Sequence, residues 1–218
     1  MPGFPANPRL AEVQALLTEA WRGPVVVERW DRVEPWAVAR ALVSGSGSYR
    51  TVIVKWVRNG VAEARIERWR LGAELAALRF LSDDLGLALA PRVLAADPAA
   101  GFVVLEDLAP RVALDCLICR DGAAAHLERL AVFARVLGEL GAVTAGRVEV
   151  YSARWSALGQ RWLATVWDHV CEDAAALGVP LSGPAASEIA AALDELQTPG
   201  PFLALSNGDA ESNNILVR

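Results

Sequence analysis

The chain has 218 residues, of which 54% are hydrophobic and 22% are charged, and its formal net charge is −5. This composition excludes an intrinsically disordered chain, because disordered chains lack the apolar residues that form a core. It also argues against nucleic acid as a partner, which calls for a basic face, since residues 1–107 carry 13 basic and 13 acidic side chains and residues 108–218 carry 8 and 13.

Helical and extended patterns alternate along the first half of the chain. Asn7 and Pro8 form a helix start, and apolar residues then recur at helical spacing, which predicts an amphipathic helix. Runs rich in Val, Ile and Trp predict strands, and Ser44–Ser48 predicts a flexible connection between two of them. The expected order is one helix, three strands, one helix and two strands, over residues 8–21, 25–30, 36–43, 51–58, 61–81, 91–96 and 102–105.

The pattern becomes mainly helical after Leu108-Ala109-Pro110, which marks a domain boundary. We therefore expect an α+β fold in two parts, with a sheet and its helices in residues 1–108 and a mainly helical part in residues 109–218. The elements expected in the second part are four helices over residues 112–119, 122–145, 152–177 and 184–197, and a short strand over residues 215–217.

No stretch reaches the roughly 18 to 20 apolar residues of a membrane helix, so we expect no membrane partner. The start of the chain, MPGFPANPRL, lacks the layout of a signal peptide, and the three cysteines form no disulfide framework. A cytoplasmic location is therefore expected. Cys116 and Cys119 lack a second pair of ligands, so we expect buried helical thiols rather than a zinc site. For His126 and His169 we expect surface or core roles.

Lys55 is the single lysine among 21 basic residues, which suggests chemistry that needs a compact ammonium rather than a guanidinium. It lies in TVIVKW and shares a strand face with Ile53. A half-buried ammonium needs a carboxylate partner, or else it extends along the surface into water. Glu74 in the next predicted helix is one candidate partner, and the spacing leaves Glu63 and Glu67 open as well.

The segment LSNGDAESNNILV at residues 205–217 contains a second group of polar side chains. Asn-Gly-Asp predicts a tight turn, and Asp209 and Asn214 precede an apolar strand. Such a carboxylate can accept a proton from a hydroxyl group, while an amide oxygen can bind Mg²⁺ beside a phosphate. A plain turn before a strand remains the alternative.

In this order, the strand lysine, the helix glutamate, LEDL at 105–108 and the Gly-Asp-x4-Asn loop resemble the aminoglycoside phosphotransferase and choline kinase group, relatives of the protein kinases. The resemblance implies a protein-kinase-like two-lobe fold, in which residues 1–108 form a nucleotide-binding lobe and residues 109–218 a partial helical lobe. It implies transfer of a phosphoryl group from ATP or GTP, with Mg²⁺, to a small hydroxylated molecule, for example an aminoglycoside. The acidic second half suits a cationic substrate, although a solvated acidic surface explains it equally simply.

The same resemblance implies a role for each matching residue. Lys55, steadied by Glu74, would bind the α- and β-phosphates. Asp209 would orient the substrate hydroxyl and accept its proton, and Asn214 would bind Mg²⁺. The main chain of three residues would face the purine between the lobes, namely Glu106, Asp107 and Leu108.

Three departures from the family pattern stand beside these matches. Asn207 takes the place of a histidine, and the expected nucleotide loop at residues 31–35 lacks glycine. The family's second metal-binding aspartate would follow the asparagine loop, and the 218 residues end before it, so we expect one Mg²⁺ ligand to be missing. An inactive pseudokinase or fragment that binds nucleotide or a protein partner is therefore one alternative. An unrelated α+β binding domain is another, and it predicts that Lys55 lies far from Glu74 and Asp209.

Overall fold

The computed structural model describes seven stretches of the chain, namely residues 10–33, 37–57, 64–155, 172–179, 183–197, 204–205 and 214–217. The chain divides into two compact units. The sheet unit comprises Met1–Ala134 with Gly208–Arg218, and the helical unit comprises Arg135–Asn207. The fold is α+β, as the sequence predicts.

A five-stranded antiparallel sheet forms the centre of the sheet unit, with strand order β1-β2-β3-β5-β4. All five predicted strands are present and in the predicted order along the chain. The chain leaves the middle of the sheet after β3, re-enters at the edge as β4, and returns beside β3 as β5. The bounds are β1 Val25–Val33, β2 Val38–Gly45, β3 Thr51–Trp56, β4 Val93–Asp97 and β5 Phe102–Glu106.

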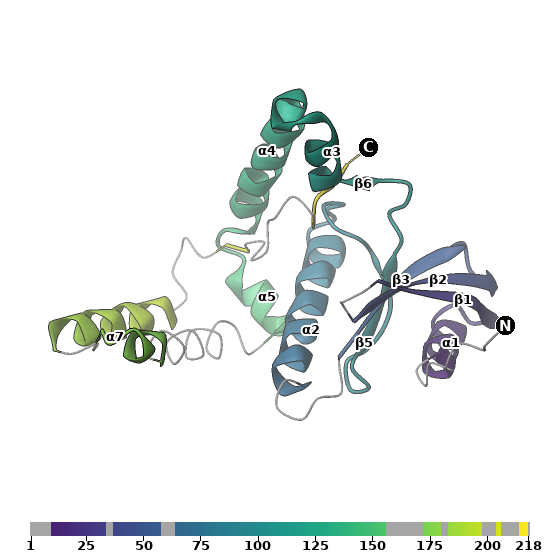
Figure 1. Ribbon diagram of the computed structural model, residues 1–218. Helices are drawn as coiled ribbons and strands as arrows, with labels where there is room; N and C mark the ends of the chain where they lie inside the picture. Colours follow the sequence, from purple (N-terminus) through teal and green to yellow (C-terminus); the bar gives the residue numbers. More distant parts are fainter. Residues whose placement is uncertain are drawn as a thin grey trace. The chain divides into compact units, whose positions relative to one another are not determined.

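Helices α1 and α2 cover opposite faces of this sheet (Figure 1). Successive side chains of a strand point to opposite faces, so one strand supplies residues to both cores. Helix α1 (Leu10–Ala20) contacts both edge strands, β1 and β4. Its core, the α1-side core, includes Val13, Leu17, Val25, Val27, Ala41, Val43, Val52, Val54, Ala95, Phe102 and Val104.

Helix α2 (Ala64–Arg79) continues into a π-helical turn, η1 (Phe80–Asp84). The helix expected over residues 61–81 is described from residue 64 onward, and Leu71, Leu75 and Leu81 in it are buried, whereas Leu78 is partly buried. The core between this helix and the sheet, the α2-side core, consists of Val57, Leu71, Leu75, Val103 and Leu105, with Ile53 packed against it.

The connection between β2 and β3 is a packed turn, and its glycines have structural roles. Gly45 has a φ angle of +103°, and a Cβ atom there would lie 2.2 Å from the Pro24 carbonyl oxygen. Gly47 has a φ angle of +110°, and a Cβ there would overlap the Trp21 ring. Trp21 in turn stacks on Tyr49, with ring centroids 6.2 Å apart. Close approach to the end of α1 therefore explains the glycines, and a phosphate-binding loop is not needed to explain them.

Replacing Gly45 with alanine is expected to lower the free energy of unfolding by about 1–3 kcal/mol, because the backbone angle and the clash with Pro24 both oppose a side chain. Gly138 offers a matched control, since it lies in a helix with open space where its Cβ would be. Gly138→Ala is expected to stabilise the protein by up to about 1 kcal/mol. Urea denaturation measures both changes, and equal stability of the two variants would contradict the structural role of Gly45.

The C-terminal residues return to the sheet unit and pair with the chain just after β5. Strand β7 (Leu216–Val217) pairs antiparallel with β6 (Val112–Ala113), and the Leu114 N–H donates to the Ile215 carbonyl at 2.8 Å. The helix predicted from residue 112 is therefore wrong at its start, because its first two residues form a strand. Helix α3 covers Leu114–Asp121.

The helix predicted over residues 122–145 is interrupted near its start. Gly122 has a φ angle of +83°, which ends α3. A 3₁₀ turn, η2 (Ala123–His126), follows, and α4 (Leu127–Thr144) leads from the sheet unit into the helical unit.

The helical unit contains α5 (Val148–Arg154) and α7 (Pro184–Gln197), and the second agrees with the predicted helix 184–197. The helix predicted over 152–177 is helical at residues 152–154 and 172–176, and residues 156–171 lie outside the described part. The Leu205 N–H donates to the Thr144 Oγ1 at 2.9 Å, which ties residue 205 to the end of α4. Within the described residues, no helix is long and apolar enough to cross a membrane.

Candidate functional site

Lys55 and Glu74 form an ion pair between the sheet and helix α2. The Lys55 Nζ lies 2.5 Å from the Glu74 Oε1. In β3, Val52 and Val54 belong to the α1-side core, so alternation places Lys55 on the other face, with Ile53 and helix α2. Both side chains of the pair are about one-third exposed, at 35% and 36%. The pair therefore lies at the margin of the α2-side core, where a ligand can reach it.

The structure selects one of the three glutamates that the spacing left open. Glu74 is the partner of Lys55, because it follows Leu71 by three residues and so lies beside the buried stripe of α2. Glu63 lies outside the described residues, and so does the side chain of Glu67. The contact between Lys55 and Glu74 is also the opposite of what the unrelated-domain alternative predicts.

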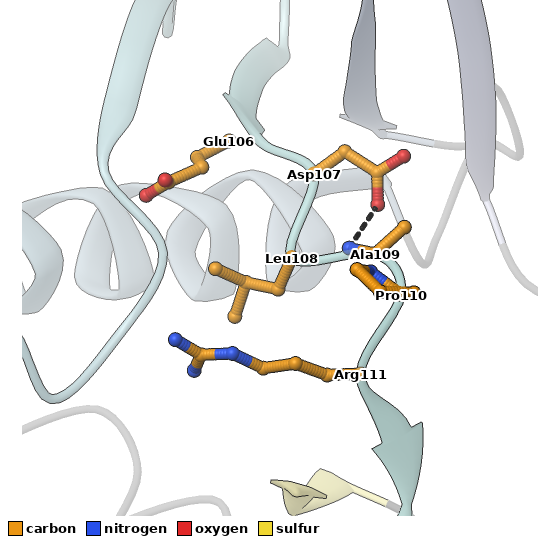
Figure 2. A pocket seen from close by; sticks show the side chains of 6 residues that line it. All are labelled: Glu106, Asp107, Leu108, Ala109, Pro110 and Arg111. Carbon is orange, nitrogen blue, oxygen red and sulfur yellow. Dashed lines mark hydrogen bonds between the residues drawn. The ribbon is translucent and has the colours of Figure 1, made fainter. Parts of the chain in front are cut away.

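A pocket of about 450 Å³ lies along the segment that leaves β5, and the described residues that line it are Glu106, Asp107, Leu108, Ala109, Pro110 and Arg111. Figure 2 shows the side chains of Glu106, Leu108 and Arg111 extending to one side of the main chain, whereas Asp107 extends to the other. The three predicted purine-facing residues are thus the first three residues of this segment.

Few main-chain groups of this segment are hydrogen-bonded. The Glu106 N–H donates to the Arg92 carbonyl at 2.9 Å, and the Arg111 N–H donates to the Leu108 carbonyl at 3.1 Å. The Leu108 N–H makes no hydrogen bond with any other described residue. Buried main-chain N–H and C=O groups nearly always make hydrogen bonds. A main-chain group that has no protein partner beside a pocket is therefore available to a ligand that covers it.

The Asp107 side chain is 3% exposed and pairs with Arg40 of β2, 67 residues earlier in the chain. The Arg40 Nε lies 2.8 Å from Asp107 Oδ2, and Arg40 Nη2 lies 3.1 Å from Oδ1. The Ala109 N–H also donates to Oδ1, at 3.1 Å (Figure 2). No sequence motif pointed to Arg40. Alternation along β2 places Arg40 on the same face of the sheet as Lys55, because Arg40 pairs with Ile53.

Asn214 lies directly before Ile215, whose carbonyl accepts the Leu114 N–H. Pairing of β6 with β7 therefore places residues 215–217 beside residues 112–114, and Asn214 lies at the end of this pairing that is farther from the pocket segment. Asp209 and Asn207 lie outside the described residues, as do residues 34–35 of the expected nucleotide loop, whose residues 31–33 belong to strand β1. The catalytic role predicted for Asp209 and the Mg²⁺-binding role predicted for Asn214 stay predictions.

The described residues contain no cluster of three or more His, Cys, Asp and Glu side chains that could bind a metal ion. Cys116 and Cys119 are free thiols and are exposed, so the expectation that they are buried is wrong. They lie one turn apart on α3, whose buried residues are Leu114 and Leu117. The hydrogen bond and negative charge of Asp115 raise the pKa of the Cys116 thiol, so the thiolate is disfavoured there.

The His126 side chain is buried, with 6% of its surface exposed. Its Nε2 lies 3.2 Å from the Leu117 carbonyl oxygen and 3.1 Å from Asp121 Oδ2, and its Nδ1 lies 3.0 Å from Arg129 Nη1. Hydrogen bonds from Arg120, with a smaller contribution from His126, lower the pKa of Asp121 to about 2. These contacts join the end of α3 to η2, which agrees with the expected core role of His126.

No protein-family model matches the chain, and a search of curated proteins finds no match either.

Proposed function

We propose that this chain is a small-molecule kinase of the aminoglycoside phosphotransferase and choline kinase type, which transfers a phosphoryl group from ATP or GTP to a hydroxyl group. The observation that carries the proposal is the 2.5 Å contact between Lys55 and Glu74, at the accessible margin of a helix-covered antiparallel sheet. The pocket at the end of β5 supports it.

An ammonium suits this position for a physical reason. Phosphoryl transfer depends on positioning and on neutralisation of phosphate charge, and it needs no covalent intermediate with the enzyme. Lysine has three N–H donors, so Lys55 can bond Glu74 and still donate to phosphate oxygens. Glu74 keeps the ammonium in one place before the nucleotide arrives.

The nucleotide base would bind at the pocket segment. The edge of a purine offers hydrogen-bond donors and acceptors, and the Leu108 N–H is a donor without a partner among the described residues. Val52, which pairs with Glu106, lies three residues from Lys55 along β3, or roughly 10 Å at about 3.3 Å per residue. An extended nucleotide can therefore contact the segment with its base and Lys55 with its phosphates.

The two remaining residues of the motif, Asp209 and Asn214, would act on the hydroxyl acceptor and on the metal ion. Asp209 would accept the proton of the attacking hydroxyl, and the Asn214 amide oxygen is a suitable Mg²⁺ ligand. The metal would supply neutralisation of the phosphate charge. The acceptor would be a small hydroxylated molecule, and the acidic second half of the chain favours a cationic one.

Thermal unfolding with Mg·ATP, Mg·GTP and no ligand tests nucleotide binding. A ligand at a hundredfold excess over its Kd stabilises the folded protein by about 2.7 kcal/mol, so a clear rise in melting temperature is expected with at least one nucleotide. No rise with either would overturn the proposal. Phosphate transfer to aminoglycosides, sugars and amino alcohols is measured next, and binding without transfer to any of them would favour the inactive nucleotide-binding alternative.

A further inference from the structure

Arg40 and Asp107 connect strand β2 to the pocket segment across the intervening strand β3. Arg40 Nη2 donates one hydrogen bond to Asp107 Oδ1, and Arg40 Nε lies 2.8 Å from Oδ2 as an ion-pair contact without hydrogen-bond geometry. Within the described residues, the Arg40 guanidinium bonds Asp107 alone. A carboxylate that is 3% exposed needs such a partner, because an unpaired charge at that depth is costly.

Asp107 uses the same carboxylate to shape the main chain that lines the pocket. Its Oδ1 accepts the Ala109 N–H, and the Arg111 N–H then closes a turn onto the Leu108 carbonyl. These two bonds fix the segment from residue 107 to residue 111 while leaving the Leu108 N–H without a partner among the described residues. Whatever fixes the Asp107 side chain therefore also fixes the direction of the Leu108 N–H.

We propose that Arg40 is a positioning residue for the nucleobase, which it controls through Asp107 and the turn at residues 107–111. The inference rests on the proposed function, since it assumes that the pocket segment binds a base. Arg40 pairs with Ile53, which lies in β3 between Lys55 and Val52, the residue that pairs with Glu106. Arg40 is therefore closer than Lys55 to the segment where the base is expected to bind. Its effect is confined to the base, because the phosphates lie at Lys55.

The test compares a ligand that has a base with one that lacks it. Calorimetry measures the Kd of Mg·ATP and of magnesium tripolyphosphate for the wild-type chain, Arg40→Met and Arg40→Lys. We expect Arg40→Met to weaken Mg·ATP binding about tenfold, which is the value of one to two main-chain hydrogen bonds, and to change tripolyphosphate binding less than twofold. Arg40→Lys keeps one bond to Asp107 and is expected to recover part of the ATP affinity.

Arg40→Met leaves the Asp107 charge buried without its partner, and this variant therefore has a companion, Arg40→Met with Asp107→Asn. The asparagine oxygen can still accept the Ala109 N–H, and no buried charge is left unpaired. We expect the same base-specific loss in the double variant, because the link to β2 is still absent. Arg120→Met is the matched control, since Arg120 also pairs with an aspartate, Asp121, on helix α3.

The outcomes separate the two proposals. A tenfold loss for Mg·ATP alone, in Arg40→Met and in the double variant but not in Arg120→Met, supports the positioning role. Wild-type ATP affinity in the double variant, or equal losses for both ligands, overturns that role and leaves the proposed function in place. A wild-type chain that binds tripolyphosphate but not Mg·ATP or Mg·GTP overturns both.

Discussion

Replacing Lys55 with methionine is expected to remove all of the stabilisation that Mg·ATP gives to the folded protein. At a hundredfold excess of nucleotide over the wild-type Kd, the loss is about 2.7 kcal/mol. Methionine has a similar length and packs against the same apolar neighbours, but it offers the phosphates no positive charge. The measurement is the shift in melting temperature with Mg·ATP in the wild-type chain and in the variant.

The unliganded Lys55→Met protein is expected to differ from the wild type by no more than about 1 kcal/mol, because each partner of the ion pair is about one-third exposed and water screens it. This small effect separates loss of binding from loss of folding. Glu74→Gln is the matched control, which keeps the ammonium and weakens its anchor. We expect Glu74→Gln to retain part of the nucleotide shift, and a full shift in Lys55→Met would contradict the phosphate-binding role.

Replacing Leu17 with alanine is expected to lower the free energy of unfolding by about 2–5 kcal/mol. The Leu17 side chain is 0% exposed and lies in the α1-side core, where α1 contacts the two edge strands of the sheet. The substitution removes apolar contacts and leaves a cavity that neighbouring strands fill only in part. Urea denaturation followed by far-ultraviolet circular dichroism measures the change.

Leu127→Ala is the control for this effect, because Leu127 is 64% exposed at the start of α4 and the substitution is the same. It is expected to change stability by no more than about 0.5 kcal/mol. Equal effects of the two substitutions would contradict the assignment of α1 to the core of the sheet unit. Since α1 lies on the face opposite Lys55, Leu17→Ala also separates loss of stability from direct damage to the candidate site.

The local sequence pattern was sufficient for the order of elements in the sheet unit. Richness in Val, Ile and Trp identified β3, and alternation along it placed Lys55 on the face of Ile53, opposite Val52 and Val54. These predictions succeed because burial on one face leaves a periodic trace within a few residues. The same rule failed at residues 112–113, where pairing with residues more than a hundred positions later outweighs the local pattern.

Contacts between distant residues needed the tertiary structure. Spacing left three glutamates open for Lys55, and only the packing of α2 on the sheet decided for Glu74. Nothing local linked Arg40 to Asp107, and nothing local indicated that β5 pairs with β3 while β4 forms the edge. Local patterns were enough to locate the five strands and two helices between residues 10 and 106 and the face of β3 that carries Lys55. The tertiary structure decided the partners, because strand order and helix docking depend on the burial of whole faces, to which residues far apart in the chain contribute together.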